Sequence, residues 1–146
     1  MQVLPVTSKD YDEIFSVWEK SVRASHTFLK EEDIQNLIPT VKEKVIPYTD
    51  IYCIRAADTA ITGFMGVSGD EVTMLFVSPE YFGRGIGTAL MNYAIHELNC
   101  TRVDVNEQNP NALKFYQKLG FKVVTRSPLD GLGNPFPLLH MKRVII

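Results

Sequence analysis

Three glycines at every second position, Gly83, Gly85 and Gly87, form the pattern in this sequence that most directly suggests chemistry. They follow an apolar run that ends at Val77 and precede a segment whose apolar residues repeat at helical spacing. A strand, a glycine loop and a helix in that order direct several backbone N–H groups and the positive end of a helix dipole to one point. Because glycine has no Cβ, the backbone can approach an anion closely. The natural ligand of such a loop is a phosphate or diphosphate, although glycines at this spacing also make ordinary tight turns.

The loop differs from two well-known nucleotide-binding loops. No Gly-Lys-Ser/Thr follows it, as it would in a Walker loop, and its spacing is not the Gly-x-Gly-x-x-Gly of dinucleotide-binding folds. It also comes after several predicted strands rather than after the first. These departures argue against ATP and NAD as the ligand.

Size and composition predict one globular domain that covers residues 1–146. Hydrophobic residues make up 45% of the chain and charged residues 22%, and the formal net charge of −2 argues against a nucleic-acid partner. No apolar run is long enough for a membrane span, and the N-terminus does not resemble a secretory signal, so we expect a cytoplasmic protein. Cys53 and Cys100 occur without a CxxC pair or a histidine cluster, which predicts two buried thiols and no metal site.

The elements before the glycine loop must hold it in place. Residues 2–6 predict a first strand, at a sheet edge or end because of Pro5. Thr7 begins a helix with one apolar face. A second helical stretch, 34–45, is split or kinked by Pro39. Three strands of an antiparallel meander follow, at 51–55, 61–67 and 72–77.

The elements after the loop complete a mixed α/β sheet with helices on both faces. The helix that starts at the loop ends near Asn99, and the strand 102–106 should lie parallel to 72–77 because a helix separates them. Asn109 caps a further helix, which Gly120 ends. Two strands close the chain, at 121–125 and 138–144. The last strand is expected at an exposed edge, where it could pair with a second copy, so a monomer and a homodimer both remain possible.

Two separated motifs resemble those of the GNAT N-acetyltransferases. The first is Gly83-Arg84-Gly85-Ile86-Gly87 after a strand, and the second is Asn109-x-x-Ala112-x-x-Phe115-Tyr116-x-x-x-Gly120-Phe121. The segments 105–109, 121–123 and 133–139 look most like a small bacterial branch, the YjaB-like acetyltransferases. The resemblance covers the whole chain in element order. It implies a mostly antiparallel sheet, with one parallel pair of strands that splay apart, and acetyl-CoA as co-substrate.

The resemblance also implies where acetyl-CoA binds. Its pantetheine arm would lie between the splayed strands and pair with the backbone of the first of them, while its diphosphate would sit on the loop amides. Asn109 would hydrogen-bond the arm, act as a plain helix cap, or do both. The family usually has Arg or Gln at the position of Phe82, so we expect weakened but not abolished coenzyme affinity. The implied cofactor-binding residues are Leu75, Phe76, Val77, Gly83, Arg84, Gly85, Ile86, Gly87, Thr88 and Asn109.

The same pattern suggests catalytic and substrate residues. Tyr116 matches the family position for the general acid that protonates the departing thiolate, although it could instead be a core tyrosine. His26, in the joint between the first two helices, is the candidate general base; Glu71, Glu107 or ordered water are alternatives. Candidate acceptor contacts are Trp18, which more often packs in a core, Phe28 and Asn106.

These observations predict an acetyl-CoA-dependent N-acetyltransferase. A primary amine of a small molecule, a peptide or a protein would attack the thioester carbonyl directly, and most of the rate gain would come from holding the two substrates in line. An alternative is a non-catalytic acyl-CoA-binding regulatory module on the same fold. A purely structural domain is a third possibility, but it requires both motifs to arise by chance.

Overall fold

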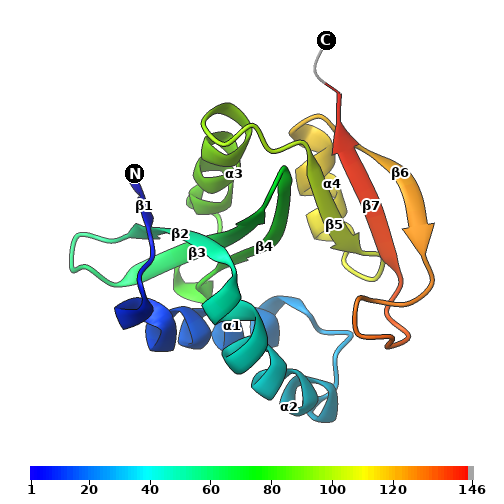
Figure 1. The fold of residues 1–146 in the computed structure, drawn as a ribbon, viewed down its shortest axis with the longest axis horizontal. Coiled ribbons are helices and arrows are strands. Elements are labelled where there is room, and N and C mark those ends of the chain that lie inside the picture. Colours follow the sequence, from blue (N-terminus) through cyan, green and yellow to red (C-terminus); the bar gives the residue numbers. More distant parts are fainter. Residues whose placement is uncertain (145–146) are drawn as a thin grey trace.

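The computed structural model describes residues 1–144, and within them the strands form one seven-stranded sheet in the order β1-β2-β3-β4-β5-β7-β6 (Figure 1). The strands are β1 (Val3–Pro5), β2 (Asp50–Arg55), β3 (Ile61–Ser68), β4 (Glu71–Val77), β5 (Arg102–Asn106), β6 (Phe121–Ser127) and β7 (Leu138–Arg143). The main helices are α1 (Tyr11–Ser25), α2 (Glu31–Thr40), α3 (Ile86–His96) and α4 (Pro110–Lys118). The predicted mixed α/β fold, with its mostly antiparallel sheet, is confirmed.

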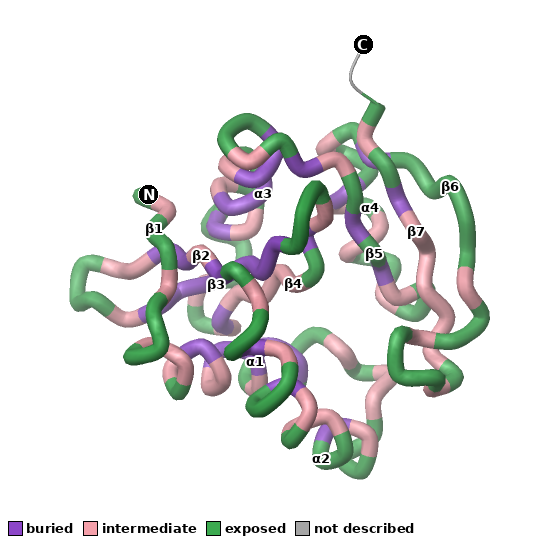
Figure 2. The backbone as a smooth tube through the Cα atoms, viewed as in Figure 1, coloured by how far each residue is buried: buried purple, intermediate pink, exposed green. Residues whose placement is uncertain are grey.

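The helices cover both faces of the sheet, as predicted. On one face α3 and α4 pack on a core that includes Leu90, Phe121 and Met141. On the other face α1 and α2 pack on a second core, which includes Ile14 and Phe64. Figure 2 shows the buried residues concentrated along the middle strands and on the inward sides of the helices. The two cores fix the strands from which the candidate site is built.

The N-terminal elements follow the local sequence signals. The Asp10 carboxylate accepts a hydrogen bond from the Thr7 backbone N–H at 3.0 Å, and a short turn, Ser8–Asp10, leads into α1. Helix α2 ends one residue after Pro39, and the chain continues as the π-helical turn Val41–Val45. Proline lacks the N–H that an α-helix needs at that position, so the predicted break lies where expected.

The parallel pair β4 and β5 diverges along its length. The two strands pair at Glu71–Arg102 and Val72–Val103, and in the described part of the chain they do not pair beyond that point. On its other side β4 has a bulge. Val67 of β3 pairs with Val72 and its neighbour Gly66 pairs with Met74, which leaves Thr73 of β4 without a partner residue on β3. A bulge bends a strand and increases its twist. We attribute the splayed pair, which the sequence resemblance implied, to this bend.

The expectation that the last strand lies at an exposed edge is wrong. Strand β7 lies between β5 and β6, and its Met141 is matched with Val103 on one side and Val123 on the other. Met141 is buried, whereas most β6 side chains after Phe121 are exposed. The edge of the sheet is therefore formed by β6, the less apolar of the two strands. Dimerisation by edge pairing through β7 is therefore not available.

Candidate active site

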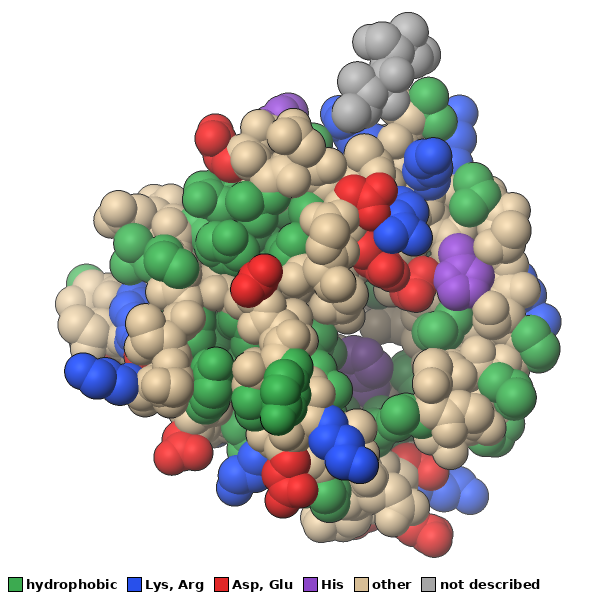
Figure 3. All heavy atoms as spheres, viewed as in Figure 1, with side chains coloured by type: hydrophobic (Ala, Val, Ile, Leu, Met, Phe, Trp, Pro, Cys, Tyr) green, Lys and Arg blue, Asp and Glu red, His purple; other side chains and the backbone are tan. Residues whose placement is uncertain are grey.

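A cleft opens where β4 and β5 separate, and it collects residues from four parts of the chain. Figure 3 shows the hollow in this face of the molecule, with a histidine side chain at its bottom. The predicted residues that it brings together are His26, Leu75, Phe76, Asn106, Asn109 and Tyr116. The other lining residues are Val72, Thr73, Met74, Asp104, Val105 and Ala112.

The glycine loop forms a second hollow beyond the end of β4. It is lined by the predicted residues Val77, Gly83, Gly85, Ile86, Gly87 and Thr88, together with Tyr81, Phe82 and Phe115. Gly83 and Gly85 have φ angles of +74° and +79°, a region that favours glycine. No oxygen in residues 1–144 accepts a hydrogen bond from the backbone amides of residues 83–88. The six amides at the N-terminus of α3 therefore have no acceptor in the described residues, and their binding of an anion stays a prediction.

The side chains beside the loop are only partly engaged. The Arg84 guanidinium lies 5.3 Å from the centre of the Tyr81 ring. Phe82, which occupies the place where the resemblance implies Arg or Gln, is 47% exposed. Within this hollow the backbone therefore supplies most of the polar contacts that a phosphate would need.

Tyr116 is held by aromatic contacts and faces the cleft. Its ring packs edge-on against Phe115 and Phe121, with centroid distances of 5.2 and 5.9 Å, and the residue is only 8% exposed. Its hydroxyl donates to no group in residues 1–144. Because no fully buried polar side-chain atom there lacks a partner, this hydroxyl must be reachable from the cleft. Burial raises the pKa of Tyr116 above its ordinary value, so the phenol stays protonated at neutral pH.

His26 follows the last residue of α1 and reaches the same cleft. Its ring lies 5.4 Å from Phe28 and 5.9 Å from Phe76, centre to centre. Desolvation by these neighbours lowers the pKa of His26 below its ordinary value, which favours the neutral imidazole at pH 7. A neutral imidazole can accept a proton, as a general base must.

The two asparagines of the cleft are both fixed locally. The Asn109 side-chain oxygen accepts from the Ala112 backbone N–H at 3.2 Å, so the predicted helix cap is confirmed. The Asn106 side-chain oxygen accepts from the Gln108 N–H at 2.9 Å, which closes a turn after β5. These hydrogen bonds set the side-chain orientations without blocking the cleft that both residues line.

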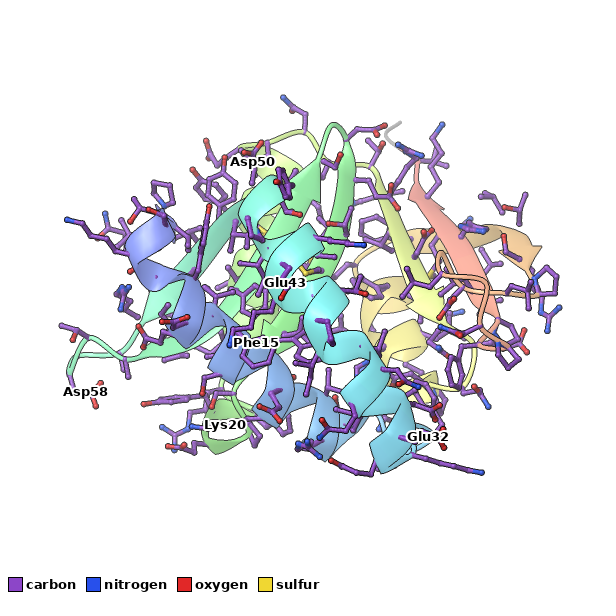
Figure 4. All side chains as sticks on the ribbon, turned by 60° about the horizontal axis from the view of Figure 1, so that its bottom comes forward. Phe15, Lys20, Glu32, Glu43, Asp50 and Asp58 are labelled. Atoms are coloured by element: carbon purple, nitrogen blue, oxygen red, sulfur yellow. The ribbon has the colours of Figure 1, made fainter. Side chains whose placement is uncertain are left out.

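The two aromatic residues predicted to contact the acceptor differ in position. Phe28 lies 5.9 Å from Phe136, centre to centre, so the α1–α2 loop meets the β6–β7 loop beside the cleft. Trp18 is 4% exposed in the core beneath α1 and stacks on Phe15, which Figure 4 labels. The apolar face of α1 buries Trp18 against the sheet, so the structure does not bring it to the cleft. Trp18 is therefore a core residue, which was the alternative to a contact with the acceptor.

The alternative bases lie outside the cleft lining. Glu107 pairs with Arg126 on the surface, and that guanidinium lowers the pKa of the carboxyl. Burial, and then the nearby Asp104 carboxylate, raises the pKa of Glu71, but Glu71 lines a neighbouring surface depression instead.

Sequence reasoning missed two residues that the structure places at the site. Asp104 lines the cleft and lies 2.6 Å from His140 on β7. Side chains alternate along a strand, and Asp104 lies between Val103 and Val105, which are both buried in the core under α3 and α4. The sequence therefore did indicate that Asp104 points to the opposite face of the sheet. Phe136 carried no such signal, because only the folded loop brings it to Phe28.

The separated strands β4 and β5 and the loop amides without an acceptor are the features that the resemblance to acetyltransferases implied. A family model described as "Acetyltransferase (GNAT) domain" matches residues 47–123. The chain therefore belongs to the GNAT acetyltransferase family.

Individual relatives agree with this assignment. The peptidyl-lysine N-acetyltransferase YjaB of Escherichia coli K12 is 36% identical over 133 residues, which cover 91% of this chain and 90% of the relative. The solution structure of apo-form YjaB from Escherichia coli superposes with a TM-score of 0.89 at 33% identity, over 99% of this chain and 98% of the other. The structure of the PaiA N-acetyltransferase from Thermoplasma acidophilum in complex with coenzyme A has a TM-score of 0.76 at 23% identity and covers 99% and 100% of the two chains.

The protein is an N-acetyltransferase that uses acetyl-CoA. The relatives are named as enzymes, which does not favour the non-catalytic binding module. Within residues 1–144 no group of three or more His, Cys, Asp or Glu side chains is arranged to hold a metal ion. Nor does that part of the chain contain a helix both long and apolar enough to cross a bilayer.

Proposed function

We propose that residues 1–146 act as one domain that acetylates the side-chain amine of lysine residues in proteins or peptides. Two relatives that match about nine-tenths of the chain are named as peptidyl-lysine N-acetyltransferases. A lysine side chain is long, unbranched and apolar up to its ammonium group. The cleft offers the aromatic side chain of Phe76 for such a stem and the Asp104 carboxylate for its charge, and Phe28 lies beside the cleft against His26.

The groups that the site presents match the parts of acetyl-CoA that need to be bound. The amides of residues 83–88 would hold the diphosphate, because residues 83 and 85–88 line one hollow and the six amides donate to no oxygen in the described residues. The edge of β4 at Leu75, Phe76 and Val77 would hold the pantetheine arm, because β5 has separated from it there. Asn109, which caps the N-terminus of α4, lines the same cleft. Bound acetyl-CoA supplies an acetyl thioester, the activated acyl group.

Two side chains would move protons. The neutral His26 imidazole accepts a proton from the acceptor ammonium, directly or through water, since only the free amine is nucleophilic. The protonated Tyr116 hydroxyl donates a hydrogen bond, and then its proton, where negative charge develops on the departing sulfur. Asn106, at the end of β5, would orient the acceptor from the cleft lining, and Phe28 would do so from beside His26.

The unpartnered loop amides beside an open strand edge carry this proposal, and a peptide assay tests it. We expect acetylation of the lysine Nζ when the purified protein is incubated with acetyl-CoA and a lysine-containing peptide, measured as a mass increase at that residue. The matched control is the same peptide with arginine in place of lysine. Acetylation of small polyamines with no product on any lysine peptide would contradict the proposed acceptor.

Replacing Phe82 with arginine is expected to tighten coenzyme A binding about threefold to tenfold. Phe82 is exposed at the rim of the loop hollow, so an arginine there can donate to a phosphate without displacing core residues. Isothermal titration calorimetry with coenzyme A measures the change, and Phe82→Leu is the uncharged control. Equal affinities of the arginine and leucine variants would show that this position does not contact the phosphates.

A further inference from the structure

The hydrogen bonds around His26 restrict where its ring can carry a proton. The Ser25 hydroxyl oxygen lies 2.7 Å from the Ser21 carbonyl oxygen and 2.8 Å from His26 Nδ1. A serine hydroxyl has a single proton, and a carbonyl oxygen can only accept. The Ser25 proton must therefore go to Ser21, because otherwise two oxygen lone pairs would face each other at 2.7 Å.

We infer that Ser25 is a positioning residue that holds His26 in its Nδ1–H tautomer. With its proton committed to Ser21, the Ser25 oxygen can contact Nδ1 at 2.8 Å only by accepting from an N–H there. In the neutral ring the other nitrogen, Nε2, then carries the lone pair. This inference deepens the proposed function and rests on it, because it supplies the base in the required tautomer.

The lone pair at Nε2 is available to a substrate. No group in residues 1–144 bonds to Nε2, and no fully buried polar side-chain atom there lacks a partner, so Nε2 must meet open space. His26 lines the cleft together with Asp104 and Tyr116, its other titratable residues. Burial lowers the pKa of His26 and keeps the ring neutral before the reaction.

The proton transfer balances through this chain of groups. The N–H bond of the acceptor ammonium breaks and its proton forms a bond to Nε2, which leaves the free amine and an imidazolium. The imidazolium keeps its Nδ1–H bond to Ser25, and Ser25 keeps its own bond to Ser21. No proton on Ser25 has to move, so a single hydroxyl both selects the tautomer and stabilises the charged ring.

Nuclear magnetic resonance tests the tautomer without any turnover. Long-range ¹H–¹⁵N correlations distinguish a protonated Nδ1 from a protonated Nε2, and the chain contains only three histidines. His26→Asn identifies the His26 signals by their loss. We expect Nδ1–H in the wild-type protein above the pKa of the ring, and a mixture of tautomers in Ser25→Ala. A wild-type ring protonated at Nε2 would overturn the inference, even if Ser25→Ala did not fold.

Kinetics then separate this inference from the proposed function. We expect Ser25→Ala to lower kcat/KM for the lysine peptide about tenfold at pH 7, with the KM for acetyl-CoA within about twofold of wild type. Ser25→Thr keeps the hydroxyl and should restore activity. Equal activity of the alanine and threonine variants would overturn the positioning role. A fully active His26→Asn with an Nδ1–H signal in the wild type would instead refute His26 as the base and leave the hydrogen-bond assignment intact.

Discussion

Replacing Tyr116 with phenylalanine is expected to lower kcat about 100-fold and to leave the dissociation constant of coenzyme A within about twofold of wild type. The change removes one hydroxyl that faces the cleft and keeps the ring that packs on Phe115 and Phe121. The lost interaction forms only as charge develops on the departing sulfur, so the effect should fall on kcat rather than on binding. Steady-state release of coenzyme A thiol measures kcat, and calorimetry measures binding.

Tyr93→Phe is the matched control. Tyr93 lies on α3 against Tyr52, with a ring centroid distance of 5.7 Å, and it does not line the cleft. It should retain full kcat. Because burial raises the pKa of Tyr116 above its ordinary value, the phenol should stay protonated, and the wild-type rate should not fall through its ionisation, as the pH rises from 7 to about 9. A Tyr116→Phe enzyme with kcat within about threefold of wild type would rule out proton donation by this residue.

Local signals in the sequence were sufficient for most of the fold and for the parts of the site that depend on neighbouring residues. The glycine loop, the Asn109 cap and the end of α4 near Gly120 each depend on a few adjacent residues, and each lies where predicted. The parallel direction of β4 and β5 followed from the helix between them. Such features need no knowledge of distant contacts.

The features that sequence reasoning missed depend on contacts between distant segments. From the sequence alone, β7 could lie at the edge of the sheet or inside it. The burial of Met141 beside Val103 accounts for its place between β5 and β6. Trp18 has the same type and helical spacing whether it faces a core or a cleft, and its neighbours place it in the core. Phe136 meets Phe28 only because two loops converge, which periodicity cannot predict.

Replacing Gly85 with aspartate is expected to raise the dissociation constant of coenzyme A about 100-fold relative to Gly85→Asn. Gly85 has φ +79°, which asparagine and aspartate tolerate better than other side chains, and an added Cβ would meet nothing closer than 4.0 Å. The two variants have nearly the same shape, so they share any steric or backbone cost. Aspartate adds a negative charge beside the amides proposed to hold the diphosphate, and two unit charges about 5 Å apart repel by roughly 3 kcal/mol at an effective dielectric constant of about 20.

Stability and salt dependence distinguish this repulsion from a folding defect. A carboxylate at the N-terminus of α3 interacts favourably with the helix dipole, by about 0.3–1 kcal/mol, so Gly85→Asp should melt no lower than Gly85→Asn. The affinity ratio of the two variants should shrink in about 1 M salt, because the Debye length there is only about 3 Å. Binding and stability are thus expected to change in opposite directions. Equal coenzyme A affinity of the two variants at low salt would mean that the diphosphate does not bind at the amides of residues 83–88.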